Sequence, residues 1–394
     1  MAEAAPVRPL RPPLATPHFA QADALRALAI SLVFIEHVAI FGDLHLFGRF
    51  QDLAFLGRWA VNCFFVLSGK LLAGQYLVAI IRDRPFPSTS AFYLKRFLRI
   101  YPLYAVGILV GAVVEYVLHG YFAFTWVAGH LIFAQGFSLA FRDDPINGPL
   151  WTMTIDAEFY LLLPLFAVVV ARAVRGATQR RKVGFILATL ALIAVVSIAY
   201  RYLAFALFPG AQESFPLLVI VVRNVVGMAS AFAFGTLLAL LEELGVRRRL
   251  RFGILASAVG FIAFVGIISV KSSGHALHAK VWADFVAAFN TAAVLYTLSA
   301  IRSPRFTAVL NSKAIAVLAT LAYGVYLIHS PVMRVVSSAS VSRFGIGPVG
   351  SVGYCILLGL ACALFSILLA FVLNRYVERP FLRLKRRVSN APEG

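Results

Sequence analysis

Long apolar runs alternate with short polar connections along the entire chain. Most of the runs approach or exceed the roughly 20 residues that a helix needs to cross a bilayer. They lie near residues 24–41, 53–81, 100–119, 123–141, 151–174, 183–206, 216–241, 252–271, 283–301, 313–335 and 348–374. The pattern predicts an all-α, polytopic membrane protein and leaves no stretch for a large soluble domain.

Clusters of basic residues indicate which runs cross the membrane. They occupy the connections 82–99, 172–182, 247–251 and 302–313 and the tail RLKRR. Positively charged connections favour the cytoplasmic side. If all eleven runs crossed, the basic connection 172–182 would face outward. We therefore assign the run 123–141, the one most interrupted by polar residues and glycine, to a re-entrant or interfacial segment. Ten transmembrane helices with both termini cytoplasmic then satisfy every cluster.

The ends of the chain differ in composition from the apolar centre. We expect a disordered, Pro-rich cytoplasmic tail at 1–20, an integral membrane domain at 21–385 and a cytoplasmic tail at 386–394. No A-x-A-like cleavage site follows the first apolar run, so this run is predicted to be a retained helix. Residues 89–99 are predicted to form a short amphipathic cytoplasmic helix.

Composition supports the membrane assignment. Of the 394 residues, 61% are hydrophobic and 13% charged, and the mean hydropathy of +0.85 lies outside the range of soluble globular proteins. The Lys and Arg residues that give the net charge of +19 cluster between the apolar runs. This distribution is typical of membrane topology signals and argues against nucleic-acid binding. The three cysteines lie inside apolar runs at spacings that suit neither a disulfide framework nor a metal site.

The first apolar run keeps three ionisable residues, Arg26, Glu36 and His37. Such residues cost at least ~2.5 kcal/mol near the bilayer centre and are functional candidates. Arg26 and His37 are about three helical turns apart, so they share a face and are separated by roughly 16 Å. Two alternatives stay open: Arg26 as an anchor that reaches the membrane surface, and His37 as a hydrogen-bonded packing residue.

Two further segments place polar residues beside apolar ones. The segment VNCFFVLSGK contains Ser68, which suits close helix packing, and Lys70, which suits either the membrane surface or an anionic ligand. The segment YLKRFLRIYPLY contains Lys95, Arg96 and Arg99 at a helix entrance. These three are either topology determinants or, beside the Tyr-Pro break, a phosphate-binding cluster.

The segment GPLWTMTIDAEFY brings carboxylates into the outer part of a predicted span. Asp156 and Tyr160 are i,i+4 neighbours on one helix face, whereas Glu158 points nearly opposite. Trp151 precedes them, and Tyr104 ends the earlier basic segment. The later segment AYGVYLIHSPV contains Tyr323, Tyr326 and His329, and its aromatic residues are also typical of the interfacial belts of membrane proteins.

Taken in order, six segments resemble acyltransferase family 3, the integral membrane O-acyltransferases of bacterial cell envelopes. They are DALRALAI followed by EH, then NCFFVLSG, KRFLRIYPLY, GPLWTMTIDAEFYLLLP, AYGVYLIH and YVERP. The resemblance covers nearly the whole chain. It implies ten transmembrane helices with cytoplasmic termini and a cytoplasmic acyl-CoA donor, typically acetyl-CoA.

The resemblance also implies roles for particular residues. His37 would be the catalytic histidine and Arg26 its paired arginine. The sequence departs from the family pattern at three positions. Lys95 replaces the first residue of a usual double arginine, Asp156 replaces a glutamate, and Lys70 replaces an aromatic or apolar residue. The first change puts bidentate phosphate contact in doubt.

These inferences combine into a predicted reaction. The CoA headgroup would dock at the basic cluster, and its pantetheine arm would extend through a channel towards His37, the general base on an acceptor hydroxyl. Asp156 or Glu36 would orient this base; an acyl-histidine intermediate stays open. The predicted catalytic residues are His37, Asp156 and Glu36. The predicted substrate-binding residues are Arg26, Ser68, Lys70, Lys95, Arg96, Arg99, Tyr104, Trp151 and Tyr160.

The expected partners are acyl-CoA, a cell-envelope glycan or glycolipid acceptor, and the lipid bilayer of the bacterial inner membrane. No metal, nucleic acid or cofactor beyond acyl-CoA is expected. The competing hypothesis is a proton-coupled secondary transporter, because ionisable residues within the membrane also serve proton relays. The sequence shows neither repeated halves nor corresponding broken helices, which favours the enzyme. It does not reveal the acceptor or the acyl chain.

Overall fold

The computed structural model describes residues 20–44, 54–122, 124–137, 146–212, 214–246, 249–269, 276–346 and 351–390. Every regular element within these ranges is a helix, which confirms the all-α prediction for them. Nine of the described helices are long and apolar enough to cross a membrane. The structure is therefore that of a multi-pass helical bundle.

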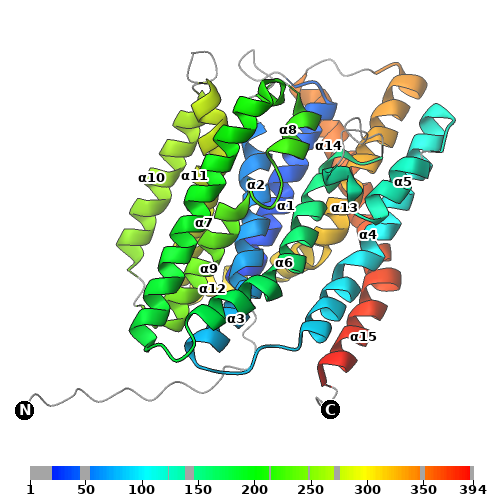
Figure 1. Cartoon of the computed structure of the whole chain (residues 1–394). Helices are drawn as coiled ribbons and strands as arrows, with labels where there is room; N and C mark the ends of the chain where they lie inside the picture. The colour runs from blue at the N-terminus through cyan, green and yellow to red at the C-terminus, as the bar shows by residue number, and fades with distance from the viewer. Residues whose placement is uncertain are drawn as a thin grey trace, which may run out of the picture.

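The long helices form the body of the bundle (Figure 1). They are α1 (Ala20–Phe41), α2 (Ala54–Ser68) with α3 (Gly74–Ile81), α4 (Thr89–His119), α6 (Trp151–Ala173), α7 (Gln179–Leu207), α10 (Leu250–Ser269), α11 (Ala276–Ala300), α13 (Lys313–Phe344) and α14 (Val352–Leu373). Shorter helices are α5 (Phe124–Leu131), α8 (Phe215–Val221), α9 (Ala229–Glu243), α12 (Pro304–Leu310) and α15 (Arg379–Asn390).

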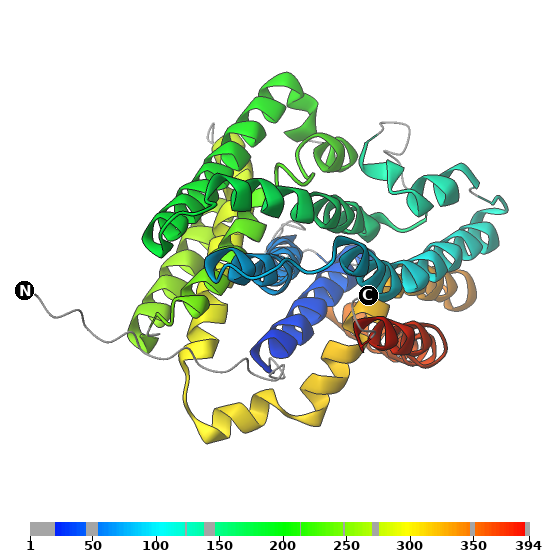
Figure 2. The ribbon, with the colours of Figure 1, turned by 60° about the horizontal axis from the view of Figure 1, so that its bottom comes forward.

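The two ends of the bundle carry different elements (Figure 1). Helices α5 and α8 lie at the end that we call upper, and α3, α12 and α15 lie at the opposite, lower end. Viewed from below, α15 packs along α4 (Figure 2). The connection after α3, the connection that holds α12, and α15 itself contain three of the basic clusters, so these clusters share the lower end.

Two apolar runs do not form one continuous long helix, as predicted for the run 123–141 but not for the run 216–241. Within the run 123–141, α5 has eight residues and a length of about 12 Å, less than half the bilayer core. The run 216–241, predicted as one span, is divided into α8 and α9 by non-helical residues 222–228. At this break Asn224 Oδ1 accepts from the amides of Val226 and Gly227, a local bond that competes with the helix.

The predicted amphipathic helix 89–99 is the first part of a longer element. It continues without a break into the span beyond it, and the two together form the 31-residue α4. At the C-terminus α15 extends to Asn390, into the predicted tail 386–394. The predicted N-terminal tail lies outside the described residues except for Ala20.

Helix α2 lies at the centre of the bundle, in contact with α1, α9 and α11. Its contact with α9 depends on two glycines, because a Cβ on Gly235 would collide with the Val66 carbonyl and one on Gly69 with the Phe232 carbonyl. Small residues of this kind let membrane helices approach closely. The close packing holds α2 against α9, while α2 also contacts α1, the helix that carries Arg26, Glu36 and His37.

Candidate active site

Two cavities lie inside the bundle at different heights. The upper cavity has a volume of about 610 Å³ and lies between α1, α2, the segment 146–151, α8, α11 and α13. The lower cavity has a volume of about 220 Å³ and lies between α1, α2, α4, α6 and α13. Val61 and Tyr326 line both cavities, so the two are neighbours across these side chains.

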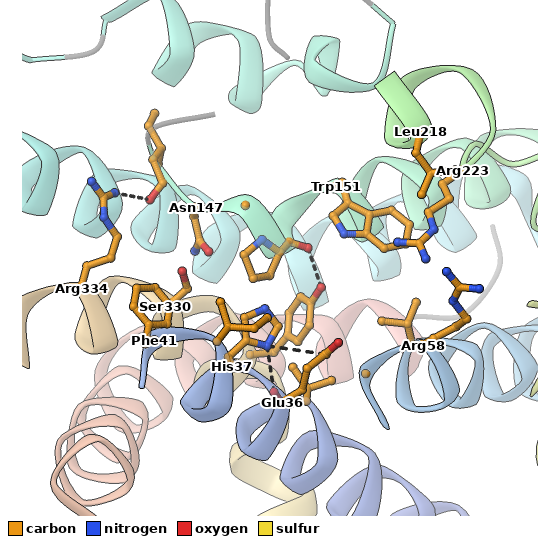
Figure 3. A pocket seen from close by; sticks show the side chains of 18 of the residues that line it. Glu36, His37, Phe41, Arg58, Asn147, Trp151, Leu218, Arg223, Ser330 and Arg334 are labelled. Atoms are coloured by element: carbon orange, nitrogen blue, oxygen red, sulfur yellow. Dashed lines mark hydrogen bonds and ion pairs between the residues drawn. The ribbon is translucent and has the colours of Figure 1, made fainter. Parts of the chain in front are cut away.

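His37 lines the upper cavity (Figure 3), and its ring is held by its own helix. The Nδ1 atom lies 2.8 Å from the carbonyl oxygen of Val33, one turn earlier. A carbonyl oxygen only accepts, so Nδ1 carries the hydrogen of the neutral ring, and Nε2 is left unprotonated. His37 in this form offers Nε2 as a base.

Glu36 lines the same cavity, next to His37. Its carboxylate lies against Gly57 of α2, where an added Cβ would collide with the carboxylate oxygens. Glu36 Oε2 is 3.9 Å from His37 Nδ1, which is ion-pair distance but longer than a hydrogen bond. The group that hydrogen-bonds Nδ1 is thus the Val33 carbonyl, and the Glu36 carboxyl group lies nearby without a hydrogen bond to it.

Two arginines extend into one side of the upper cavity (Figure 3). Arg223, from the break between α8 and α9, lies over the Trp151 ring at 5.0 Å from its centroid. Arg58 of α2 lies 3.6 Å from Asp284 of α11. The predicted ligand-binding residue Trp151 therefore lies in the cavity of His37, under a guanidinium group.

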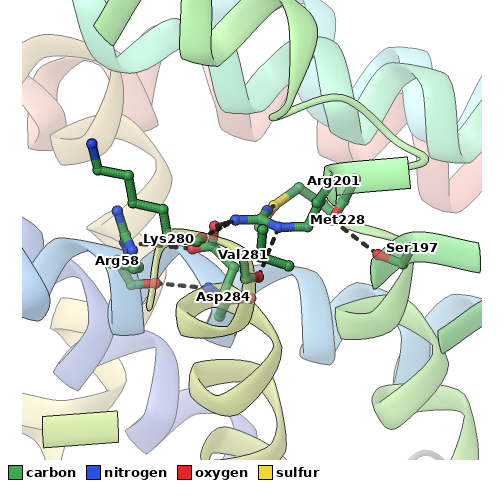
Figure 4. A network of polar contacts seen from close by, with 9 residues as sticks. Arg58, Ser197, Arg201, Met228, Lys280, Val281 and Asp284 are labelled. Atoms are coloured by element: carbon green, nitrogen blue, oxygen red, sulfur yellow. Dashed lines mark hydrogen bonds and ion pairs between the residues drawn. The ribbon is translucent and has the colours of Figure 1, made fainter. Parts of the chain in front are cut away.

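A buried network fixes the position of Asp284 (Figure 4). Arg201 of α7 donates to Asp284 Oδ2 at 2.7 Å and to the carbonyl oxygens of Lys280 and Val281 at 2.7 and 2.9 Å. The side chains of Arg201 and Asp284 are 3% and 4% exposed. Since Arg58 interacts with the same carboxylate, the network ties the wall of the upper cavity to α7 and α11.

The opposite side of the upper cavity holds another ion pair. Arg334 of α13 forms a very short contact with Glu115 of α4, and both residues line the cavity. Asn147 and Ser330 line it as well. His37 lies between this side and the side of Arg58 and Arg223 (Figure 3). The cavity therefore offers donors and acceptors around a potential base.

The lower cavity contains three arginines, Arg26, Arg96 and Arg99. Arg26 donates to Asp23 at 2.7 Å, and Arg99 donates to Glu378 at 2.6 Å. Two of the three residues of the predicted donor-binding cluster, Arg96 and Arg99 of α4, thus line this cavity, together with Arg26 of α1, which was predicted as the partner of His37. Three guanidinium groups around one small cavity suit an anionic, multiply charged ligand such as a phosphate ester.

Asp156, Ser68 and Tyr160 also line the lower cavity. The Ser68 hydroxyl lies 3.4 Å from Asp156 Oδ1, a long hydrogen bond. Asp156 is therefore placed with the arginines, in the cavity below His37. The Asp156 carboxylate thus lies in the cavity expected to bind the donor. The contact with His37 Nδ1 is made by the Val33 carbonyl of α1.

Three predicted substrate-binding residues lie elsewhere among the described residues. Lys70 is buried in a π-helical turn, and its Nζ donates to Glu242 at 2.8 Å. Tyr104 is fully buried and donates to the His130 carbonyl at 3.0 Å, which attaches the α5 segment to α4. Lys95 is half-buried at the start of α4 and is not among the lining residues of either cavity.

Tyr326 occupies the boundary between the two cavities. Its hydroxyl donates to the Pro149 carbonyl at 2.6 Å and lies 2.6 Å from the Thr152 hydroxyl. The Phe64 ring lies 6.1 Å from the Tyr326 ring. These contacts hold the tyrosine in place, so the boundary consists of an anchored phenol and the Val61 side chain.

Comparison with known proteins identifies this arrangement. Residues 19–377 match the acyltransferase family 3 model, which is described as an acyltransferase domain. The chain belongs to this family. It is similar to acyltransferase MdmB of Streptomyces mycarofaciens, with 26% identity over 394 residues that cover 94% of each chain. No solved structure matches the chain. The predicted family and enzyme class are thus confirmed.

Several residues that line the upper cavity were not predicted. Arg58, Arg223, Asp284 and Arg334 all lie within or beside predicted apolar runs. The criterion that selected Arg26 and His37, an ionisable group inside an apolar run, applies equally to them. What the sequence could not supply is their convergence, because they come from three different helices and from the break between α8 and α9.

Proposed function

We propose that this acyltransferase moves an acyl group, most simply acetyl, from CoA in the lower cavity to a hydroxyl group in the upper cavity. The acceptor is a cell-envelope glycan or glycolipid, and His37 is the general base. The observation that carries the proposal is the arrangement of two adjoining cavities, one with three arginines and the other with a histidine whose Nε2 is unprotonated.

The proposal includes an orientation in the bacterial inner membrane. The lower end faces the cytoplasm, because the basic clusters around α3, α12 and α15 share it. The nine long helices, together with α8 and α9 counted as one further, broken crossing, make ten crossings. An even number of crossings places both termini on the same side of the membrane, which the basic clusters assign to the cytoplasm. The lower cavity is then on the side where acyl-CoA is made.

The donor binds with its phosphates at the lower arginines. Arg26, Arg96 and Arg99 provide charge-assisted hydrogen bonds to phosphate oxygens. The pantetheine arm extends past Tyr326 and Val61, the two side chains that both cavities share. This route brings the thioester from the cytoplasmic side to His37 without a separate transport step.

Direct transfer accounts for every atom and proton. The acceptor hydroxyl gives its proton to Nε2 of His37, and its oxygen attacks the thioester carbonyl carbon. The tetrahedral intermediate expels CoA thiolate as the carbon–sulfur bond breaks, and the thiolate takes the proton from the imidazolium. Glu36, 3.9 Å from Nδ1, favours the transient positive charge on His37. Water in place of the acceptor hydroxyl would react in the same way, as a poorer nucleophile, and would hydrolyse acyl-CoA.

The acceptor binds in the upper cavity, where polar groups surround His37. Asn147, Ser330 and the Arg334–Glu115 pair offer donors and acceptors on one side. A hydroxyl-rich ring suits this mixture, because each sugar hydroxyl both donates and accepts. Apolar residues that line the same cavity, including Ile40 and Leu218, suit the aglycone of a glycolipid.

The test uses purified protein in lipid nanodiscs, acetyl-CoA as donor and a panel of alkyl glycosides as acceptors. Release of CoA thiol and acetylated glycoside detected by mass spectrometry are the expected results. The His37→Ala variant is expected to abolish both while it inserts and melts as the wild type does. Proton-coupled solute uptake by wild-type proteoliposomes, without thiol release from any acyl-CoA, would overturn the proposal in favour of transport.

A further inference from the structure

A second histidine lies directly beside His37, and the mechanism above does not use it. His329 of α13 is fully buried, with no exposed surface. Its ring centroid lies 4.9 Å from that of His37, and the two rings are nearly perpendicular, at 87°. This is the edge-to-face geometry that aromatic pairs prefer. His329 therefore forms part of the support of the His37 ring.

The protonation of His329 follows from its backbone contacts. Its Nδ1 lies 2.7 Å from the Tyr326 carbonyl oxygen and 3.1 Å from that of Val325. Both are acceptors, so Nδ1 carries the hydrogen and Nε2 is unprotonated. Within the described part of the chain, this buried Nε2 has no hydrogen-bond partner. An unsatisfied buried nitrogen is costly for folding, which argues that the imidazole has another purpose.

We propose that His329 is a positioning residue of the transfer reaction, an inference that rests on the proposed role of His37. Its ring fixes the plane of the His37 ring, and its unprotonated Nε2 and π electrons stabilise the imidazolium that His37 becomes during transfer. His329 does not line the described wall of either cavity. It acts on the substrates only through His37.

The geometry explains why a histidine suits this position. Each of the two rings is tied through Nδ1 to carbonyl oxygens of its own helix, so neither turns freely. The step that protonates His37 Nε2 creates a cation next to a neutral imidazole inside a low-dielectric bundle. A nearby aromatic ring or lone pair is worth more there than in water. A phenylalanine would keep the packing and lose the polar nitrogen.

Three variants at position 329 separate this role from packing. His329→Phe keeps the ring, His329→Gln places an amide near the Nε2 position, and His329→Asn places one near Nδ1. The assay is CoA-thiol release from acetyl-CoA with octyl glucoside in nanodiscs. We expect His329→Phe to lower kcat about tenfold or more, with KM for acetyl-CoA within about twofold of the wild type. His329→Gln should retain more kcat than His329→Asn.

A matched control is Met333→Leu, a volume-conserving change at another fully buried residue one turn further along α13. It should keep the wild-type kcat. Wild-type kcat in His329→Phe, or activity in His329→Asn equal to or above that in His329→Gln, would overturn the proposal. If His329→Phe fails to fold, the Gln and Asn comparison decides. Absence of thiol release by the wild type would instead refute the proposed function itself.

Discussion

Arg99 on α4 donates a hydrogen bond to Glu378 near the C-terminus, with 2.6 Å between Nη1 and Oε1. Glu378 ends a π-helical turn, Asn374–Glu378, and its second oxygen accepts from Asn374 Nδ2 at 2.7 Å. The carboxylate is 2% exposed and the guanidinium side chain 36% exposed. A buried anion thus holds a partly accessible arginine at the lower cavity, close to where CoA phosphates are proposed to bind.

We expect Arg99→Ala to raise KM for acetyl-CoA by roughly 10- to 100-fold, the change in affinity that corresponds to the loss of one hydrogen bond to a charged group. The change in kcat should be small, because Arg99 is far from the reacting atoms. The measurement is initial-rate kinetics in nanodiscs. Arg84→Ala removes an exposed positive charge at the same end of the bundle and serves as the control. Equal KM values for the two variants would contradict the donor-site assignment.

We expect His37→Ala to lower kcat by about 10²–10⁴-fold, the usual contribution of general base catalysis. Acetyl-CoA should still bind, because the lower arginines are untouched, and a fluorescent CoA analogue can measure its affinity. The variant should insert and melt like the wild type. A folded variant with more than about a tenth of wild-type kcat would assign His37 to packing.

We expect Gly57→Ala to destabilise the protein by about 1–3 kcal/mol, because the new methyl group collides with the Glu36 carboxylate. The loss should be smaller in the double variant Gly57→Ala with Glu36→Ala, in which the space is free. Thermal unfolding of the two single variants, Gly57→Ala and Glu36→Ala, and of the double variant in the same detergent measures this coupling. Strictly additive losses would show that the two residues do not touch.

We expect Asp284→Asn to cost roughly 3–5 kcal/mol, the penalty for leaving one charge of a buried ion pair without its partner. Arg201 loses its charged partner, and Arg58 loses its ion pair with α11. The control is Asp83→Asn, which removes a 79% exposed carboxylate from Lys182. That variant should lose no more than about 1 kcal/mol. Similar melting temperatures for both variants would contradict the structural role of the network.

Hydrophobic periodicity and charge were sufficient for much of the fold. Apolar length located the helices, and the basic clusters marked the weak run 123–141, in which α5 is too short to cross. They could not locate the break at 222–228. That break depends on the local bonds of Asn224 and on Glu158, which accepts from the Val225 amide at 2.8 Å. A contact between distant segments leaves no periodic signal in either one.

For the site, the relative positions of residues within one helix were easier to predict from the sequence than contacts between helices. Helical geometry predicted that Arg26 and His37 share a face of α1, and each lines one of two adjoining cavities. The sequence offered Asp156 or Glu36 as the orienting group for His37. The structure places the Val33 carbonyl against Nδ1, a partner that every helix supplies and no motif reveals.

Tyr326 has one more consequence, for the membrane as a whole. A protein with one chamber facing the cytoplasm and another facing outward would drain the proton gradient if water filled a continuous path between them. In the proposed mechanism, the phenol tied to Pro149 and Thr152 separates the two chambers at that point, and the pantetheine chain of the donor occupies the same gap during turnover. Catalysis across the bilayer is then compatible with an energised, electrically tight membrane.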